Sequence, residues 1–186
     1  MAESSVVVTS VRFTAGEAEP QYSRLLVEPE KCTGCRTCEL FCSLKNQGEV
    51  NPARSRIHVV RSQKDNIIVT IPVVCQQCDD ALCMAMCPAG ALSRNLETYA
   101  VVVDTDKCLG CRTCVEVCPF GAPSVDPRTG KSDKCDLCGG DPTCVKYCSQ
   151  EAIQFVSAEE EGMTRKRDLA DKYLDHLRTA SVRGVV

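Results

Sequence analysis

Two segments of the chain repeat one pattern: KCTGCRTCELFCSL at residues 31–44 and KCLGCRTCVEVCPF at residues 107–120. Both read Lys-Cys-x-Gly-Cys-Arg-Thr-Cys-x-x-x-Cys, but only the second copy continues with proline after its last cysteine. Each copy places three thiols within seven residues, and a fourth follows about one helical turn later. Such crowding of thiols indicates a loop that wraps a metal centre.

All sixteen cysteines of the 186-residue chain fall into four groups of four. The first and third groups have the spacing C-x2-C-x2-C-x3-C, whereas the second and fourth widen the middle gap and keep the final x3. The groups are Cys32, Cys35, Cys38 and Cys42; Cys75, Cys78, Cys83 and Cys87; Cys108, Cys111, Cys114 and Cys118; and Cys135, Cys138, Cys144 and Cys148. Because no cysteine is left over, the sequence predicts four centres with four thiolates each.

The narrow spacing is the iron-sulfur spacing of bacterial ferredoxins. A 4Fe-4S cube needs one thiolate for each of its four irons, and three closely spaced cysteines can supply three of them from one loop. Gly34 and Gly110 precede the second ligand, where a residue without Cβ allows close backbone approach. We expect the fourth cysteine of each group to begin a helix and, as in two-cluster ferredoxins, to bind the neighbouring cluster.

Other uses of sixteen cysteines stay open. Four structural zinc ions, eight disulfides, or a mixture in which a widened group holds zinc or a three-iron cluster would also employ them. Zinc sites usually join two cysteine pairs across a long loop, which differs from three ligands within seven residues. The first twenty residues lack a secretory signal, so the sequence predicts a cytoplasmic protein with reduced thiols.

The composition leaves little material for a conventional core. Cysteine makes up sixteen of the residues within the 44% counted as hydrophobic, and the chain has no Trp, four Tyr and four Phe. No apolar run approaches the roughly 20 residues that span a bilayer. A net charge of -3 with scattered basic residues also argues against a nucleic-acid partner.

The residue that follows the fourth cysteine of each group indicates which cysteine groups share clusters. Cys87 and Cys118 precede proline, whereas Cys42 and Cys148 precede serine. This difference favours pairing of the first group with the fourth and of the second with the third, although pairing of consecutive groups stays open. The resulting fold class is α+β, with nested two-cluster ferredoxin units of short strands and helices. The expected domains are an outer unit of residues 1–60 and 130–157, an inserted inner unit of residues 61–129, and a C-terminal helical docking tail of residues 158–186.

The remaining segments predict short strands and one helix. Residues 56–60 and 67–74 indicate a hairpin, residues 152–156 a returning strand, and residues 99–104 a strand before the third group. The segments SSVVVTSVRF (4–13) and YSRLLVEP (22–29) indicate an edge sheet. From Thr164 an apolar stripe predicts a helix that packs on the chain itself, on a partner or on a second copy. His58 and His176 are interpreted as surface residues rather than ligands.

With these four groups the chain resembles the four-cluster, ferredoxin-like electron-transfer subunits of molybdenum and tungsten oxidoreductases, such as formate dehydrogenases and dimethyl sulfoxide reductases. The resemblance covers roughly residues 25–156. The stretch CRTCELFCSLKNQGEVNPARSRI (35–57) most resembles the small iron-sulfur subunit of tungsten-dependent aldehyde oxidoreductases. Two departures, a compact fourth group and no membrane anchor, argue against a quinone-linked, membrane-bound complex.

The resemblance implies four ligand sets, each holding one 4Fe-4S cluster. Set 1 is Cys32, Cys35, Cys38 and Cys148; set 2 is Cys135, Cys138, Cys144 and Cys42; set 3 is Cys75, Cys78, Cys83 and Cys118; set 4 is Cys108, Cys111, Cys114 and Cys87. It also implies a non-catalytic subunit that relays single electrons between a tungsten or molybdenum aldehyde (or similar) oxidoreductase and a flavoprotein or ferredoxin. A freely diffusing polyferredoxin, or the iron-sulfur subunit of a formate dehydrogenase- or hydrogenase-type complex, are the alternatives.

Overall fold

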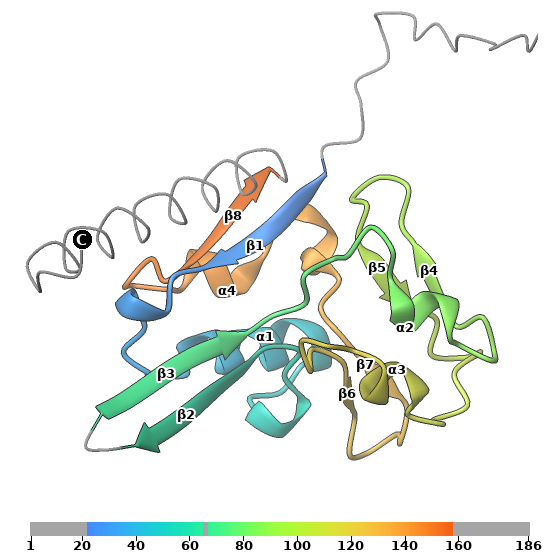
Figure 1. The fold of residues 1–186 in the computed structure, drawn as a ribbon, viewed down its shortest axis with the longest axis horizontal. Helices are drawn as coiled ribbons and strands as arrows, with labels where there is room; N and C mark the ends of the chain where they lie inside the picture. The colour runs from blue at the N-terminus through green and yellow to red at the C-terminus, as the bar shows by residue number, and fades with distance from the viewer. Residues whose placement is uncertain (1–21, 65–66, 158–186) are drawn as a thin grey trace, which may run out of the picture.

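A computed structural model describes residues 22–64 and 67–157 as a mixed α+β fold of short strands and helices (Figure 1). The strands are β1 (Ser23–Val27), β2 (His58–Lys64), β3 (Ile67–Val73), β4 (Leu92–Arg94), β5 (Val101–Val103), β6 (Ser124–Val125), β7 (Ser132–Asp133) and β8 (Ile153–Ser157). The helices are α1 (Thr37–Gln47), α2 (Leu82–Ala85), α3 (Thr113–Glu116) and α4 (Thr143–Lys146), with 3-10 turns at Pro29–Lys31, Pro52–Arg54 and Leu137–Gly140. The predicted strand at 4–13, the predicted tail helix and His176 lie outside the described residues.

The first and last strands of the described chain form one sheet. β1 pairs antiparallel with β8, and Leu25 stands opposite Phe155. Figure 1 shows the two strands side by side, with α4 next to them. The returning strand predicted at residues 152–156 is therefore confirmed, and it pairs with the first strand of the described residues.

The predicted hairpin is present and longer than expected. β2 and β3 pair antiparallel from His58 opposite Val73 to Lys64 opposite Ile67. Val59 is buried whereas Val60 is half exposed, because neighbouring residues of a strand face opposite sides. The strand expected before the third cysteine group is also present as β5, which pairs with β4.

The prediction that the fourth cysteine of each group begins a helix was wrong. The third cysteine does so instead: Cys38, Cys83, Cys114 and Cys144 each occupy the second residue of a helix. Three of the helices last only four residues. The fourth cysteine therefore comes one turn after the third, within α1 in the first group and just past the helix end in the others.

Helices α1 and α4 join the beginning and the end of the described chain. The rings of Phe41 and Tyr147 stack with their centroids 3.6 Å apart and their planes 4° from parallel. The larger hydrophobic cluster contains Leu25, Cys38, Cys42, Ile57, Val59, Val74, Ala100, Leu137, Cys144 and Ile153. A smaller cluster contains Ala81, Leu92, Val101 and Cys114. Cysteines thus form part of both clusters.

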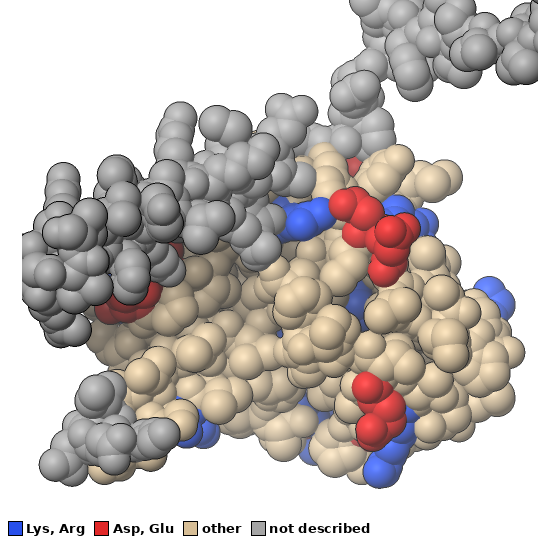
Figure 2. Space-filling model, viewed as in Figure 1, with Lys and Arg blue, Asp and Glu red and all other residues tan. Residues whose placement is uncertain are grey.

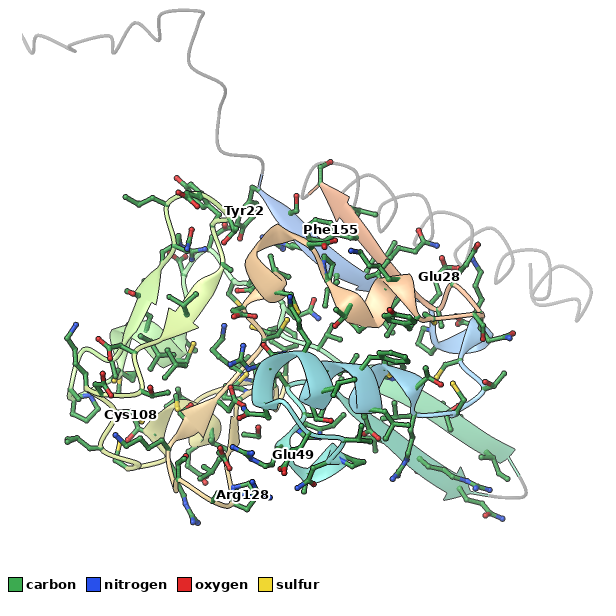
Figure 3. All side chains as sticks on the ribbon, turned by 180° about the vertical axis from the view of Figure 1, so that it is seen from behind. Tyr22, Glu28, Glu49, Cys108, Arg128 and Phe155 are labelled. Atoms are coloured by element: carbon green, nitrogen blue, oxygen red, sulfur yellow. The ribbon has the colours of Figure 1, made fainter. Side chains whose placement is uncertain are left out.

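A polar joint connects the segment after α1 to the β6–β7 turn. The buried Arg54 guanidinium donates two hydrogen bonds to Asp126, from Nε at 3.0 Å and from a terminal nitrogen at 2.7 Å. Arg54 also donates to Glu49 at 3.0 Å, and Glu49 accepts from Arg128 at 2.7 Å. Figure 3 shows Glu49 and Arg128 close together at this joint. Through Arg54 and Asp126, a bidentate ion pair shielded from water ties two distant parts of the chain.

Charged side chains are sparse on the face seen in Figure 2, where uncharged residues dominate the described surface. The larger acidic groups visible there adjoin basic groups, whereas other basic groups stand alone among uncharged residues. Within the described part of the chain, no helix is long and apolar enough to cross a membrane.

We expect Arg54→Met to destabilise the protein several times more than Arg128→Met. The first change leaves the Asp126 carboxylate buried without its partner, whereas Arg128 is mostly exposed and its ion pair is screened by water. Denaturant unfolding of the anaerobic protein measures the difference, and Asp126→Asn should resemble Arg54→Met. Equal losses for the two arginine variants would contradict a stabilising function of the joint.

Candidate iron-sulfur centres

Three of the four predicted ligand sets each line one cavity. All four cysteines of set 1 line the first cavity, together with Val59, Pro72 and Ile153. All four cysteines of set 2 line the second, and all four of set 3 line the third. In each case three thiols come from one cysteine group and the last comes from a distant group. The donor chemistry of each cavity, four thiols around one partly open space, fits a 4Fe-4S cube.

The cysteines of set 4 are connected by indirect contacts. The backbone N–H of Ser132 donates to Cys108 Sγ at 3.4 Å, and the thiol of Cys114 donates to the Ser132 hydroxyl oxygen at 3.1 Å. Cys87 packs against the smaller hydrophobic cluster, of which Cys114 is a member. Cys111 is exposed at the surface of the described protein. Ser132, which the sequence interpretation did not single out, thus links two ligands of this set.

Backbone N–H groups point at several of the cysteine sulfurs. Arg56 donates to Cys42 at 3.4 Å, Ala91 donates to Cys87 at 3.3 Å, and Leu137 donates to Cys135 at 3.4 Å. Hydrogen bonds of this kind favour the charged thiolate and tune the reduction potential of a cluster that it binds.

Burial strongly disfavours ionisation of the inner thiols when no metal is bound. Burial, with the charge of Glu39 second, raises the pKa of Cys38 to about 12. Burial also raises the pKa of Cys135 to about 12 and raises the pKa of Cys144. Iron ligation requires the deprotonated thiolate, so metal binding and folding of these cavities are coupled.

The pKa of the second cysteine of each repeated segment is lowered, unlike the raised pKa values of the inner thiols. The Thr37 hydroxyl hydrogen-bonds Cys35 and lowers its pKa, and the Thr113 hydroxyl lowers the pKa of Cys111 in the same way. Both thiols are exposed. The repeated phrase Gly-Cys-Arg-Thr-Cys therefore presents, in both copies, one accessible thiol that ionises more readily than an ordinary cysteine.

The cavities are close enough for their thiols to affect one another. Besides burial, neighbouring charges that raise the pKa of Cys144 include the set 1 thiol Cys38. The charge of the set 3 thiol Cys75 similarly contributes to the raised pKa of Cys135 in set 2. Set 2 is therefore next to both set 1 and set 3.

Gln77 joins sets 2 and 3 and was missed by the sequence interpretation. Its side chain is fully buried, donates to the carbonyl oxygen of Cys135 at 2.9 Å and accepts from the backbone N–H of Val101 at 2.9 Å. The only signal in the sequence was its location between Cys75 and Cys78, which does not distinguish a buried amide from an exposed one.

The glycine of each repeated segment lies where a side chain would not fit. Gly34 has φ +73°, and a Cβ on it would lie 2.9 Å from Thr70 Cγ2. Gly110 has φ +69°, and its Cβ would lie 2.6 Å from the carbonyl oxygen of Gly130. The sequence predicted that these glycines allow close backbone approach to a cluster, and that stays a prediction. In the described structure the atoms that exclude a Cβ belong to Thr70 and Gly130.

Within residues 22–64 and 67–157, no three His, Cys, Asp or Glu side chains are grouped as ligands of a single metal ion. In a 4Fe-4S cube each thiolate binds a different iron, so the four sulfurs surround the cluster rather than one ion. His58, interpreted as a surface residue, begins β2 opposite Val73 and is partly buried.

Short strands, one-turn helices and four-thiol cavities together define a ferredoxin-type iron-sulfur protein. Comparison with known families identifies it further: a 4Fe-4S dicluster domain matches residues 66–158, and a 4Fe-4S binding domain matches residues 29–46. The chain belongs to the 4Fe-4S dicluster family.

Several curated relatives are named as subunits of oxidoreductases. The polyferredoxin-like subunit of aliphatic sulfonate oxidoreductase from Pyrococcus furiosus is 38% identical over 81% of this chain and 88% of its own. A probable anaerobic dimethyl sulfoxide reductase chain from Escherichia coli K12 is 36% identical, covering 72% and 73%. The thiosulfate reductase electron transfer subunit of Salmonella typhi is 32% identical, covering 76% and 79%. Iron-sulfur electron-transfer subunits are therefore homologues of this chain.

We expect Gly110→Ala to reduce both the thermal stability and the metal content of the anaerobic protein. The added methyl group would meet the Gly130 backbone, so the loop of the third cysteine group must move. Gly121→Ala is the matched control, because Gly121 also has positive φ, +61°, but faces open space. The control should lose only about 1–2 kcal/mol of folding free energy for the left-handed backbone and keep its metal. Equal effects would contradict the steric explanation.

Proposed function

We propose that this chain is the electron-transfer subunit of an oxidoreductase complex and that it holds four 4Fe-4S clusters. The lining of three separate cavities by four cysteines each is the observation that carries this proposal. When bound, such clusters take up and release single electrons. The protein supplies the thiolates, the N–H donors that stabilise them and the apolar surroundings that limit access of water.

The proposed ligand sets are those implied by the family resemblance, sets 1 to 4. The cavities support sets 1, 2 and 3, and the Ser132 contacts together with the packing of Cys87 support set 4. This assignment pairs the first cysteine group with the fourth and the second with the third. It corresponds to an outer unit of residues 1–60 and 130–157 and an inner unit of residues 61–129, with residues 158–186 as a docking tail.

Contacts between the proposed sets 1, 2 and 3 support an order in space that suits a relay. The shared hydrophobic cluster of Cys38, Cys42 and Cys144 supports adjacency of sets 1 and 2. The hydrogen bond from Gln77 to the carbonyl oxygen of Cys135 supports adjacency of sets 2 and 3. The exposed thiols Cys35 and Cys111 belong to sets 1 and 4. We propose that redox partners approach these two ends.

The catalytic partner is proposed to be a tungsten or molybdenum oxidoreductase subunit that acts on an aldehyde or a similar substrate. The resemblance of residues 35–57 favours tungsten, and the homologous subunits of sulfonate, dimethyl sulfoxide and thiosulfate enzymes favour this broader class. This chain would itself be non-catalytic and would exchange electrons with a flavoprotein or ferredoxin. Its sixteen free thiols suit the reducing cytoplasm.

Cys42→Ser tests the cross-connection between the first and fourth groups. We expect the change to alter the cluster held mainly by Cys135, Cys138 and Cys144, because Cys42 lines their cavity. Electron paramagnetic resonance of the reduced protein should show one altered cluster, and Cys138→Ser should alter the same signal. Damage confined to the signal that Cys83→Ser changes would refute the pairing.

Anaerobic purification of the tagged chain from its native host tests the function. We expect about sixteen irons and sixteen sulfides per chain, interacting spins on reduction, and a stoichiometric partner that contains tungsten or molybdenum. About four zincs without labile sulfide would refute the clusters. Fully loaded protein that elutes without any partner would instead favour a free polyferredoxin, and a partner with nickel would favour a hydrogenase-type complex.

A further inference from the structure

Lys134 is a buried lysine between two of the cysteine cavities. Its side chain lines the cavity of set 3, and the residue is only 2% exposed. The ammonium donates to the backbone carbonyl oxygens of Val101 and, at 2.8 Å, of Cys135. Cys135 belongs to set 2, so this cation lies where the second and third sets meet.

Among the described residues, no carboxylate pairs with the charge of Lys134. Within residues 22–64 and 67–157, Lys134 forms no ion pair, whereas the buried Arg54 pairs with Asp126 and the largely buried Arg56 pairs with Asp133 and Asp136. Asp80 lines the same cavity but is exposed to solvent. A buried charge with only neutral carbonyl partners is costly unless a counter-charge lies nearby.

With a cluster bound, the thiolates of set 3 would supply the counter-charge, because Lys134 and all four of these cysteines line the same cavity. Burial raises the pKa of Cys83, and the positive charge of Lys134 is the largest influence that opposes this rise. The same charge opposes the burial-driven rise at Cys135. The interaction between Lys134 and these sulfurs is thus attractive on both sides of the residue.

Set 1 has the opposite electrostatic surroundings. Glu39 follows the ligand Cys38, is 4% exposed, and accepts a hydrogen bond from the backbone N–H of Val59 at 2.7 Å. Arg36 Nε lies 3.7 Å from its other oxygen, and Arg36 is itself largely exposed. The buried anion Glu39 adjoins set 1, whereas the buried cation Lys134 adjoins set 3. An electron added to a cluster in set 1 would therefore be less favoured than one added to a cluster in set 3.

We propose that Lys134 is a positioned counter-charge that raises the reduction potential of the cluster bound by Cys75, Cys78, Cys83 and Cys118. Uptake of one electron adds one negative charge to this site without making or breaking a bond, and a fixed ammonium beside the site stabilises that charge. The electron comes from the redox partner of the complex. This inference rests on the proposed function, because it requires a cluster in set 3.

Redox titration monitored by electron paramagnetic resonance tests the proposal. Lys134→Gln removes the charge while keeping a hydrogen-bond donor, and Lys134→Arg keeps the charge. The signal of set 3 is first identified from Cys83→Ser. At a fixed potential, we expect Lys134→Gln to lower the reduced-to-oxidised ratio of this cluster about tenfold, which equals 59 mV for one electron. Lys134→Arg should remain much closer to the unmodified protein.

Lys131→Gln is the matched control. Lys131 lies three residues earlier and donates to the Thr105 carbonyl at a solvent-exposed position. Its loss changes the net charge by the same unit but should leave the potential of set 3 nearly unchanged, because water screens it. An equal shift in both glutamine variants would overturn the proposal, since net charge alone would then explain it.

The remaining outcomes also decide the matter. An unchanged potential in fully loaded Lys134→Gln would overturn the proposal. Loss of the set 3 cluster from both Lys134 variants would also overturn it, because binding of the cluster would then depend on the shape of the lysine side chain rather than on its charge. If only Lys134→Gln loses the cluster, the potential of Lys134→Arg decides: a shift as large as tenfold in the reduced-to-oxidised ratio would overturn the proposal, and a nearly unchanged ratio would support it. Failure of the proposed function is distinct, because the unmodified protein would then contain no cluster to titrate.

Discussion

The thiols that line each four-cysteine cavity come from two distant stretches of chain, and much of the fold follows from this constraint. Cys148 meets Cys32, Cys35 and Cys38 only because the end of the described chain returns to its beginning. Strands β1 and β8 make that return, and the stacked rings of Phe41 and Tyr147 hold α1 against α4. Few other large apolar side chains are available, so cysteines themselves complete the hydrophobic clusters.

Polar contacts connect distant segments of the chain, which in a protein with a larger hydrophobic core would be held together mainly by apolar packing. Arg54 with Asp126, Arg56 with Asp133 and Asp136, and Gln77 with Cys135 connect segments that are distant in the chain. Each is directional, so it specifies one relative arrangement of the connected segments in a way that apolar burial alone does not. The adjacency of sets 2 and 3 thus depends on defined hydrogen bonds rather than on a flexible linker.

The same packing creates different electrostatic surroundings for similar ligands. Cysteines at equivalent places in repeated motifs are chemically identical, yet Cys38 is buried beside Glu39, while the inner cavity of Cys83 is lined by Lys134. A relay of single electrons requires sites whose potentials differ in a controlled way. On the proposal made for Lys134, a buried charge at the boundary of a cavity would provide such control without altering the thiolates.

The sequence alone determined the local features of this protein. Cysteine spacing predicted the grouping of thiols, and strand patterns predicted the hairpin of β2 and β3 and the return of β8, because spacing and periodicity act over a few residues. The start of the short helices was predicted one cysteine too late, since four-residue helices leave almost no periodic signal. Only the tertiary structure placed Gln77 and Lys134 in the interior and set the Gly130 carbonyl against Gly110. A polar residue looks the same in a sequence whether water or protein surrounds it, so its burial is decided by contacts between segments that the chain order does not reveal.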